Sequence, residues 1–104
     1  MKETSTFFAP MLYLKKVAPA IEFYKKAFDA IELKRWSNDD GSVHVVEMSF
    51  DGVLFHLHEE VTRTNELNPE TLKGTPVAIG LFVNDVHAVM AKAVTAGGTE
   101  IDPV

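Results

Sequence analysis

The stretch that decides the fold is residues 42–59, which read SVHVVEMSFDGVLFHLHE. Two runs rich in β-branched and aromatic residues flank Asp51-Gly52, a dipeptide typical of tight β-hairpins. A two-residue turn fixes the pairing of its strands, so Phe50 faces Val53 and each further pair is set. The sequence therefore predicts two antiparallel strands in a defined register.

One face of this hairpin is apolar. The register places Met48 opposite Phe55 and Val46 opposite Leu57, and a face of this kind is suited to burial under a helix. His44 alternates onto the same face, but it lies at the end of its strand beside a turn. We therefore expect His44 at the boundary of the core.

The other face of the hairpin carries ionisable groups. Glu47 lies directly across from His56, and His58 follows two positions along the same strand. Histidines at this spacing lie roughly 7 Å apart at their backbones, so both rings can converge on one ion. Glu47, His56 and His58 would then suit a divalent metal, namely zinc, iron, nickel or manganese. The favoured interpretation is metal-free, because a half-exposed antiparallel sheet normally carries polar or ligand-lining pairs on its outer face.

The residues before the hairpin extend the order of elements to β-α-β-β-β. Residues 7–15 are apolar and aromatic and predict a strand. Pro19 suits the first turn of a helix, and apolar residues recur at helical spacing after it. Residues 31–37 predict a second strand, which ends at the turn cluster of residues 38–41. This first module covers about residues 7–60.

A polar linker, residues 61–75, leads to a partial second module over residues 76–104. Within it we expect a strand over residues 76–84, a helix capped by Asp85, and a helix end at Gly97-Gly98. The fold class is thus α+β within one domain, 1–104.

The second module repeats the first. A shift of 69 positions, which lays Leu12 on Leu81, superposes the apolar positions of both strands and both helices without a gap. A further strand would begin at Thr99, and the sequence stops at Val104. We therefore expect a truncated or cleaved form of a longer parent, and a mainly structural or dimerisation role is one alternative for it.

The amino-acid composition limits the kinds of partner that this chain is expected to bind. The chain has 104 residues, a formal net charge of −5, no block of Lys or Arg and no cysteine. These features argue against nucleic acid, disulfides and thiolate metal sites. No apolar run has signal-peptide or membrane-spanning length, so we expect a cytoplasmic protein without a membrane partner. The incomplete second module would leave a strand edge free, which favours a homodimer.

Aromatic residues supply further candidate ligand contacts. Trp36 lies beside the turn cluster with Lys34 on its own face, and Tyr13 points to the same face as Glu47. We expect the ligand-binding residues to be Tyr13, Trp36, His56, His58 and Phe82, which would hold a planar or aromatic small molecule. A core or rim position for Trp36 is the alternative.

The helix AIEFYKKAF, residues 20–28, placed after a short strand, together with Val83-Asn84-Asp85-Val86 and the Gly97-Gly98 helix end, resembles one superfamily. This is the vicinal oxygen chelate group, the glyoxalase/bleomycin-resistance/dioxygenase fold, and the chain is most similar to its glyoxalase-like and PhnB-like members. The resemblance covers residues 7–103. It implies a curved mixed sheet with helices on the outer face and a small-molecule ligand on the concave face.

The resemblance also implies where metal ligands would fall. Metal-dependent members supply four ligands, and by position these correspond to Ala9, Glu47, Ala78 and a place beyond Val104. Alanine binds no metal, so only Glu47 matches. The resemblance therefore implies either a metal-free binding protein or a metal-dependent lyase, isomerase or dioxygenase using the unusual set Glu47, His56 and His58, with Glu47 as the catalytic base or ligand. Neither a substrate nor an enzymatic activity is specified.

Overall fold

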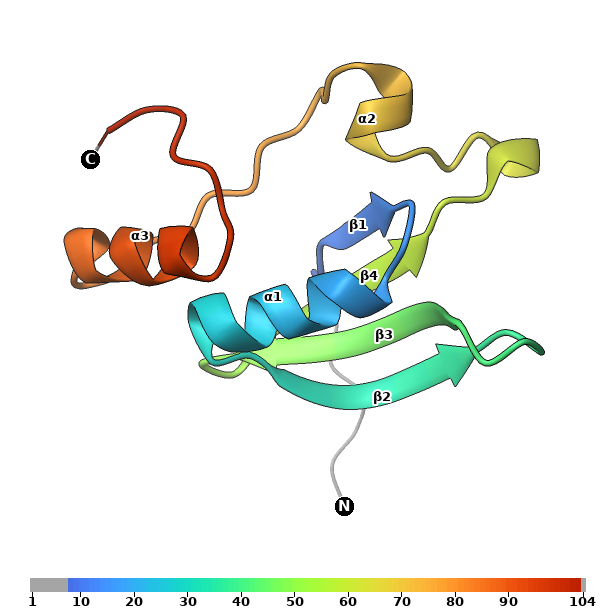
Figure 1. The fold of residues 1–104 in the computed structure, drawn as a ribbon, viewed down its shortest axis with the longest axis horizontal. Helices are drawn as coiled ribbons and strands as arrows, with labels where there is room; N and C mark the ends of the chain where they lie inside the picture. Colours follow the sequence, from blue (N-terminus) through green and yellow to red (C-terminus); the bar gives the residue numbers. More distant parts are fainter. Residues whose placement is uncertain (1–7, 104) are drawn as a thin grey trace.

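A computed structural model describes residues 8–103 and shows an α+β fold with a four-stranded mixed sheet (Figure 1). The sheet has the order β1-β4-β3-β2, with β1 parallel to β4 and the other pairs antiparallel. The elements in chain order are β1 (Met11–Leu14), α1 (Ala18–Phe28), β2 (Ile31–Ser37), β3 (Val43–Phe50), β4 (Val53–Glu59), a 3₁₀ turn η1 (Thr62–Thr64), α2 (Pro69–Leu72) and α3 (Val86–Thr95). The expected β-α-β-β-β module is present, and the predicted strand at residues 7–15 is shorter than expected, with Phe7 outside the described residues.

The β3–β4 hairpin has the predicted register. Phe50 pairs with Val53, and Glu47 pairs with His56. Asp51 and Gly52 have φ values of 51° and 80°, the paired positive values that a tight hairpin turn requires. The dipeptide Asp51-Gly52 thus fixes which side chains share each face of the sheet.

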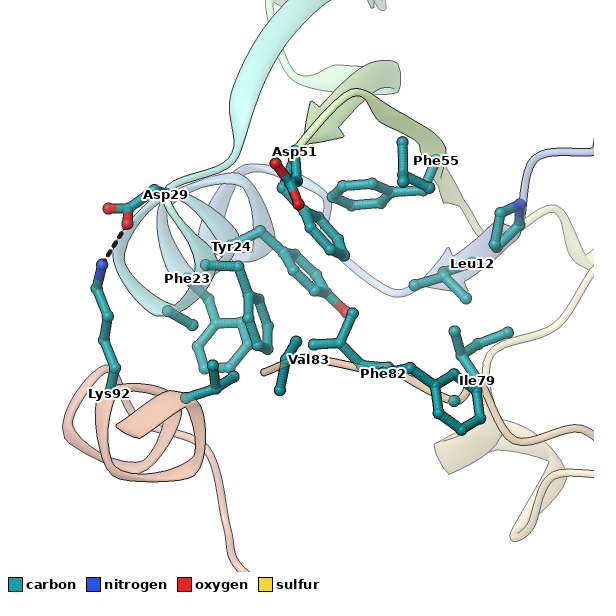
Figure 2. Close-up of a pocket in the computed structure, with 18 of the residues that line it drawn as sticks. Leu12, Phe23, Tyr24, Asp29, Asp51, Phe55, Ile79, Phe82, Val83 and Lys92 are labelled. Atoms are coloured by element: carbon teal, nitrogen blue, oxygen red, sulfur yellow. Dashed lines mark hydrogen bonds and ion pairs between the residues drawn. The ribbon is translucent and has the colours of Figure 1, made fainter. Parts of the chain in front are cut away.

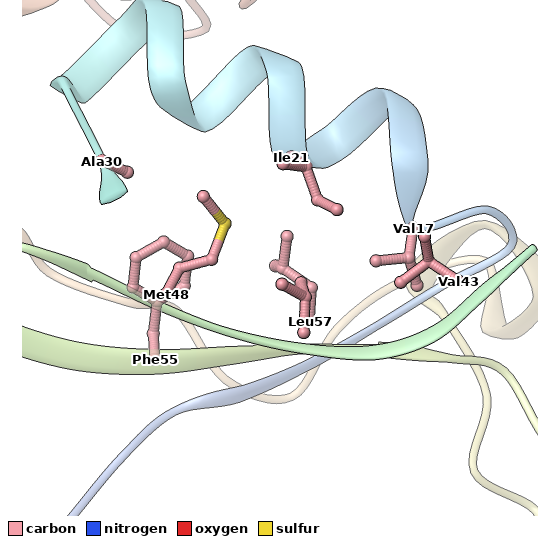
Figure 3. Packing of buried hydrophobic residues seen from close by; sticks show 8 residues of the cluster. Val17, Ile21, Ala30, Val43, Met48, Phe55 and Leu57 are labelled. Atoms are coloured by element: carbon pink, nitrogen blue, oxygen red, sulfur yellow. The ribbon is translucent and has the colours of Figure 1, made fainter. Parts of the chain in front are cut away.

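The core lies between α1 and the apolar face of this hairpin (Figure 3). Ile21 of α1 points toward Met48 and Leu57, and all three side chains are buried. Each such side chain contributes about 1.5–3 kcal/mol when it is removed from water. Burial of this face directs the opposite face of the sheet away from α1.

Helix α1 begins and ends as its sequence indicates. Pro19 lies in its first turn, where the missing N–H costs no hydrogen bond. The helix ends at Asp29, which adopts the left-handed conformation with φ 55°. The Asp29 carboxylate accepts a hydrogen bond from Lys92 of α3, and the two helices lie in contact (Figure 1).

His44 lies at the boundary of the core, as predicted, and contacts Glu59, which follows Phe55 and Leu57 on the apolar face of β4. A β-bulge shifts the pairing of β2 with β3, so Trp36 pairs with Val45 but Ser37 pairs with Val43. Val43 therefore also enters the core, which was not predicted, and His44 lies at the edge of the core with its Nδ1 3.1 Å from Oε1 of Glu59. The bulge depends on the neighbouring strand and not on the hairpin, so the hairpin register alone did not reveal it.

The linker contains more structure than expected. It holds η1 and α2, and α2 is capped by Asn68, whose side-chain oxygen accepts from the backbone N–H groups of Glu70 and Thr71. Asn68 is buried, and its amide nitrogen donates to Glu60 at 2.7 Å. Each polar atom of this buried amide is thereby satisfied.

The second module is only partly formed. Helix α3 appears as predicted, with Asp85 accepting from the N–H of Ala88 and with Gly97 in a left-handed conformation after the helix. Residues 76–84 are not a strand, contrary to the prediction, and no strand forms over residues 99–103. A strand is held by hydrogen bonds to a neighbour, and no described strand pairs with residues 76–84.

The described helices are all too short or too polar to cross a bilayer.

Candidate functional site

The face of the sheet turned away from α1 gathers most of the predicted site residues. Cross-strand pairing arranges its side chains in two rows over the four strands. The first row is Met11, His56, Glu47 and Lys34, and the second is Tyr13, His58, Val45 and Trp36. These eight residues define what we call the distal face.

Glu47 and His56 form the centre of the first row. Nε2 of His56 lies 3.2 Å from Oε2 of Glu47, and their side chains are 23% and 27% exposed. The pair is thus accessible to a ligand yet partly shielded from water. A carboxylate in contact with an imidazole can hold or move one proton, which is the elementary requirement of acid–base chemistry.

His58 occupies the centre of the second row and is the most shielded of the imidazoles. Its ring lies 5.2 Å from that of Tyr13 and stacks on that of His56 at 5.8 Å. Its Nε2 is buried and has no hydrogen-bond partner among the described residues. Burial lowers the pKa of His58, and the neighbouring His56 and His44 lower it further. Folding therefore favours the neutral form of His58, although the negative charge of Glu66 acts in the opposite direction.

Tyr13 closes one end of the second row. Its hydroxyl donates to Oε2 of Glu66 at 3.3 Å, which ties β1 to the loop that follows η1. Burial raises the pKa of Tyr13, and the negative charge and hydrogen bond of Glu66 raise it further. The phenol thus remains protonated and keeps a hydrogen to donate.

Trp36 closes the other end of this row. Its ring is half-exposed, and the Lys34 ammonium lies 4.9 Å from the ring centroid. This geometry is a cation–π contact, which orients both side chains on the distal face. A flat, accessible indole beside a cation suits stacking of a planar group, so the core alternative for Trp36 is not what the structure shows.

The metal set proposed from the sequence is not assembled. Within residues 8–103, no group of three His, Asp or Glu side chains is placed to hold a metal ion. His56 turns its Nε2 to Glu47, and the two imidazoles stack on one another. Stacked rings present their faces to each other, whereas ligands of one ion must aim ring nitrogens at a common point.

Phe82 does not join the distal face, contrary to the expectation. It lies on the α1 side of the sheet, where it lines a cavity of about 850 Å³ together with Tyr24 and Phe55 (Figure 2). Its ring is 97% exposed. The expectation placed it on a strand continuous with the sheet, and that strand is absent.

Two residues that contact aromatic side chains of the distal face, Lys34 and Glu66, were not predicted as site residues. Lys34 was placed on the correct face, but its contact with Trp36 was not predicted, although their i, i+2 spacing on β2 is the signal for it. Glu66 was missed because a loop brings it to Tyr13, and no periodic pattern specifies a loop.

No family model matches the chain. Curated relatives are uncharacterised proteins of Mycobacterium bovis (Mb0911c) and Mycobacterium tuberculosis (Rv0887c), both 38% identical over 96 residues. The match covers 89% of this chain in each case, but only 63% and 56% of the two relatives. The chain thus spans less than two thirds of the length of these relatives.

Solved structures extend the comparison. The gene product At5g48480 of Arabidopsis thaliana is 31% identical, with a TM-score of 0.74 over 97% of this chain and 80% of the plant chain. The chain belongs to the At5g48480 family. TioX from Micromonospora sp. ML1 is 15% identical, with a TM-score of 0.60 over 94% of this chain and 75% of TioX, and so shares the fold. The similarity to At5g48480 does not assign a reaction to the distal face.

Proposed function

We propose that this chain binds a planar aromatic small molecule on the distal face, as a metal-free member of the vicinal oxygen chelate superfamily. The observation that carries the proposal is the second cross-strand row, in which Tyr13 contacts His58 on the neighbouring strand and Val45 lies between His58 and Trp36. The phenol, the imidazole, the valine side chain and the indole together form a largely apolar strip with polar groups along it. Sites for small molecules combine such apolar rings with few polar groups that fix orientation.

The charges on the distal face support an aromatic ligand that carries an oxygen. Lys34 has no ion-pair partner among the described residues, and its ammonium lies over Trp36. A ring stacked on Trp36 would bring a phenolate or carboxylate oxygen toward this cation. The Tyr13 hydroxyl, which donates its hydrogen to Glu66, offers an acceptor lone pair at the opposite end of the row.

The Glu47–His56 pair supports one extension of this function, which is proton transfer to or from the bound ligand. Glu47 would accept the proton, and His56 would orient the carboxylate from 3.2 Å. Replacement of Glu47 by Gln would abolish such a reaction while leaving ligand binding nearly unchanged. Equal losses of binding and turnover would contradict the assignment of Glu47 as base.

Fluorescence of Trp36, the single tryptophan, tests the binding proposal. Titration with hydroxybenzoates, phenols and indoles should change the emission saturably for at least one of these classes. Tyr13→Ala and Lys34→Ala should each weaken that binding by roughly three- to tenfold, the effect of one lost stacking or charged contact. Lys26→Ala on α1 is the matched control and should leave binding unchanged. No saturable change with any class, or equal effects of all three variants, would contradict the proposal.

A further inference from the structure

A cavity of about 850 Å³ lies on the α1 side of the sheet, separated by the sheet from the distal face (Figure 2). Its walls are the C-terminal half of α1, the tip of the β3–β4 hairpin, the segment 79–83 and the first half of α3. This volume is in the range that accommodates a small organic molecule. None of the sequence patterns pointed to it, because the segment 79–83 forms one wall without being a strand.

Aromatic rings from α1, from the β3–β4 hairpin and from the segment 79–83 line this cavity. Tyr24 packs against Phe55 at 5.1 Å and stacks on Phe28 at 5.9 Å, and Phe50 lies 5.7 Å from Phe28. These contacts hold the rings rigidly, so a ligand would meet a preformed surface. Phe82 adds an exposed ring at the open side.

The charged residues that line the cavity carry one more negative charge than positive charges. Its charged lining residues are Asp29, Asp51 and Lys92. Asp29 and Lys92 pair with each other, whereas Asp51 has no ion-pair partner in the described part of the chain. Asp51 is exposed at the hairpin tip, where Figure 2 shows its carboxylate above the aromatic rings. The rim of an aromatic cavity is therefore negatively charged.

We propose that this cavity binds a small organic cation, an amine with an aromatic or branched apolar body. The body fills the space between Tyr24, Phe55 and Phe82, and the ammonium lies near Asp51 and the ring faces. Both interactions favour a cation, since aromatic faces and a carboxylate attract positive charge. An anion of the same shape gains only the apolar contacts and meets a like charge. This site is independent of the small-molecule function proposed for the distal face.

Two probes of equal shape and opposite charge test the class of ligand, namely 4-phenylbutylamine and 4-phenylbutyrate. Their binding to the ¹⁵N-labelled chain is measured by chemical-shift changes in amide spectra. The amine should bind at least about tenfold more tightly than the carboxylate, with the largest shifts around Asp51, Phe55 and Phe82. The indole resonance of Trp36, on the other face, should not move.

Asp51→Asn isolates the charge, because asparagine before glycine keeps the tight turn. It should weaken binding of the amine by roughly three- to tenfold and leave the carboxylate unaffected or slightly stronger. Asp39→Asn, in the turn at the other end of β3, removes the same charge elsewhere and should change neither affinity. Phe82→Ala removes an exposed ring, so the fold is retained, and should weaken binding of both probes.

Equal affinities for the two probes, or an Asp51→Asn variant that binds the amine normally, would overturn the proposal. The absence of any binding at millimolar concentration would overturn it as well. Shifts centred on Tyr13 and Trp36 would assign the amine to the distal face instead and would also contradict it.

Discussion

On the distal face, His58 is partly buried, and this burial changes its protonation equilibrium. Its Nε2 is buried without a described partner, and burial is the largest cause of its lowered pKa. In the unfolded chain the same imidazole would take up a proton near its ordinary pKa of 6.5. The folded state therefore binds fewer protons than the unfolded state just below that pH.

The stability of the fold should consequently depend on His58 in acid. The contribution of this group is fully present above the unfolded-state pKa of 6.5 and is lost progressively as the pH falls from there through the lower pKa of the folded state. We expect the free energy of unfolding, measured in urea at pH 5 to 8, to fall less steeply toward acid in His58→Gln than in the parent chain. His87→Gln, on the exposed surface of α3, is the control and should keep the parent slope. Identical slopes in all three proteins would contradict the burial of a neutral His58.

Contacts at the residue scale were predictable only where a short turn fixes them. The Glu47–His56 contact follows from the hairpin register, because Asp51-Gly52 sets every pair of the ladder. The buried nitrogen of His58 does not follow from it, since shielding depends on Tyr13 and on the loop that holds Tyr13. The positions of Glu47, His56 and His58 on one face could therefore be predicted from the sequence, but the burial that lowers the pKa of His58 could not.

At the element scale, the β3–β4 hairpin organises the molecule. It supplies the core face to α1, the two central positions of each distal-face row, and the rim carboxylate of the cavity. Its turn is therefore the position at which a local change should affect the whole fold.

Gly52→Ala should lower the free energy of unfolding by about 1–2 kcal/mol. Gly52 has φ 80°, and a Cβ added there would meet no atom within 4 Å. The loss would thus arise from backbone conformation alone and not from a clash. Asp51→Asn is the matched control and should unfold within about 0.5 kcal/mol of the parent chain. Urea denaturation measures both, and a fully stable Gly52→Ala variant would show that the turn does not determine the register.

The second module repeats the sequence pattern of the first, but only its helix forms as predicted. Helix α3 forms because its hydrogen bonds are internal and Asp85 caps it. Residues 76–84 carry the apolar pattern of β1 but do not form a strand, since no described strand is paired with them. A helix can be predicted from its own residues, whereas a strand requires its partner.

At the scale of the whole molecule, the sheet separates two surfaces of different chemistry. The distal face combines aromatic, basic and acid–base groups, and the cavity on the α1 side is aromatic with a negative rim. The sheet also ends in two edges, β1 and β2. Strand β2 exposes Ile31 and Leu33 along its edge, which is a surface that commonly pairs with another chain.

The homodimer was expected at a strand edge of the second module, and that strand does not form, so the exposed edge of β2 is the place to test it. Sedimentation velocity at micromolar to millimolar concentration should show a concentration-dependent dimer, and Leu33→Lys should shift it toward the monomer, because a lysine on an edge strand disfavours pairing. Val94→Lys, at an exposed position of α3, adds the same charge and should leave the equilibrium unchanged. A monomer at all concentrations would contradict this expectation, and a dimer insensitive to Leu33→Lys would place the interface elsewhere.

The distal face is the ligand site that we propose for the whole molecule. The measurement that tests this most directly is the set of intermolecular nuclear Overhauser effects between the tightest-binding aromatic compound and the labelled chain. We expect contacts from the ring of that compound to Trp36, His58 and Tyr13. Contacts confined to Tyr24, Phe55 and Phe82, or none to the sheet face that carries Glu47, would contradict it.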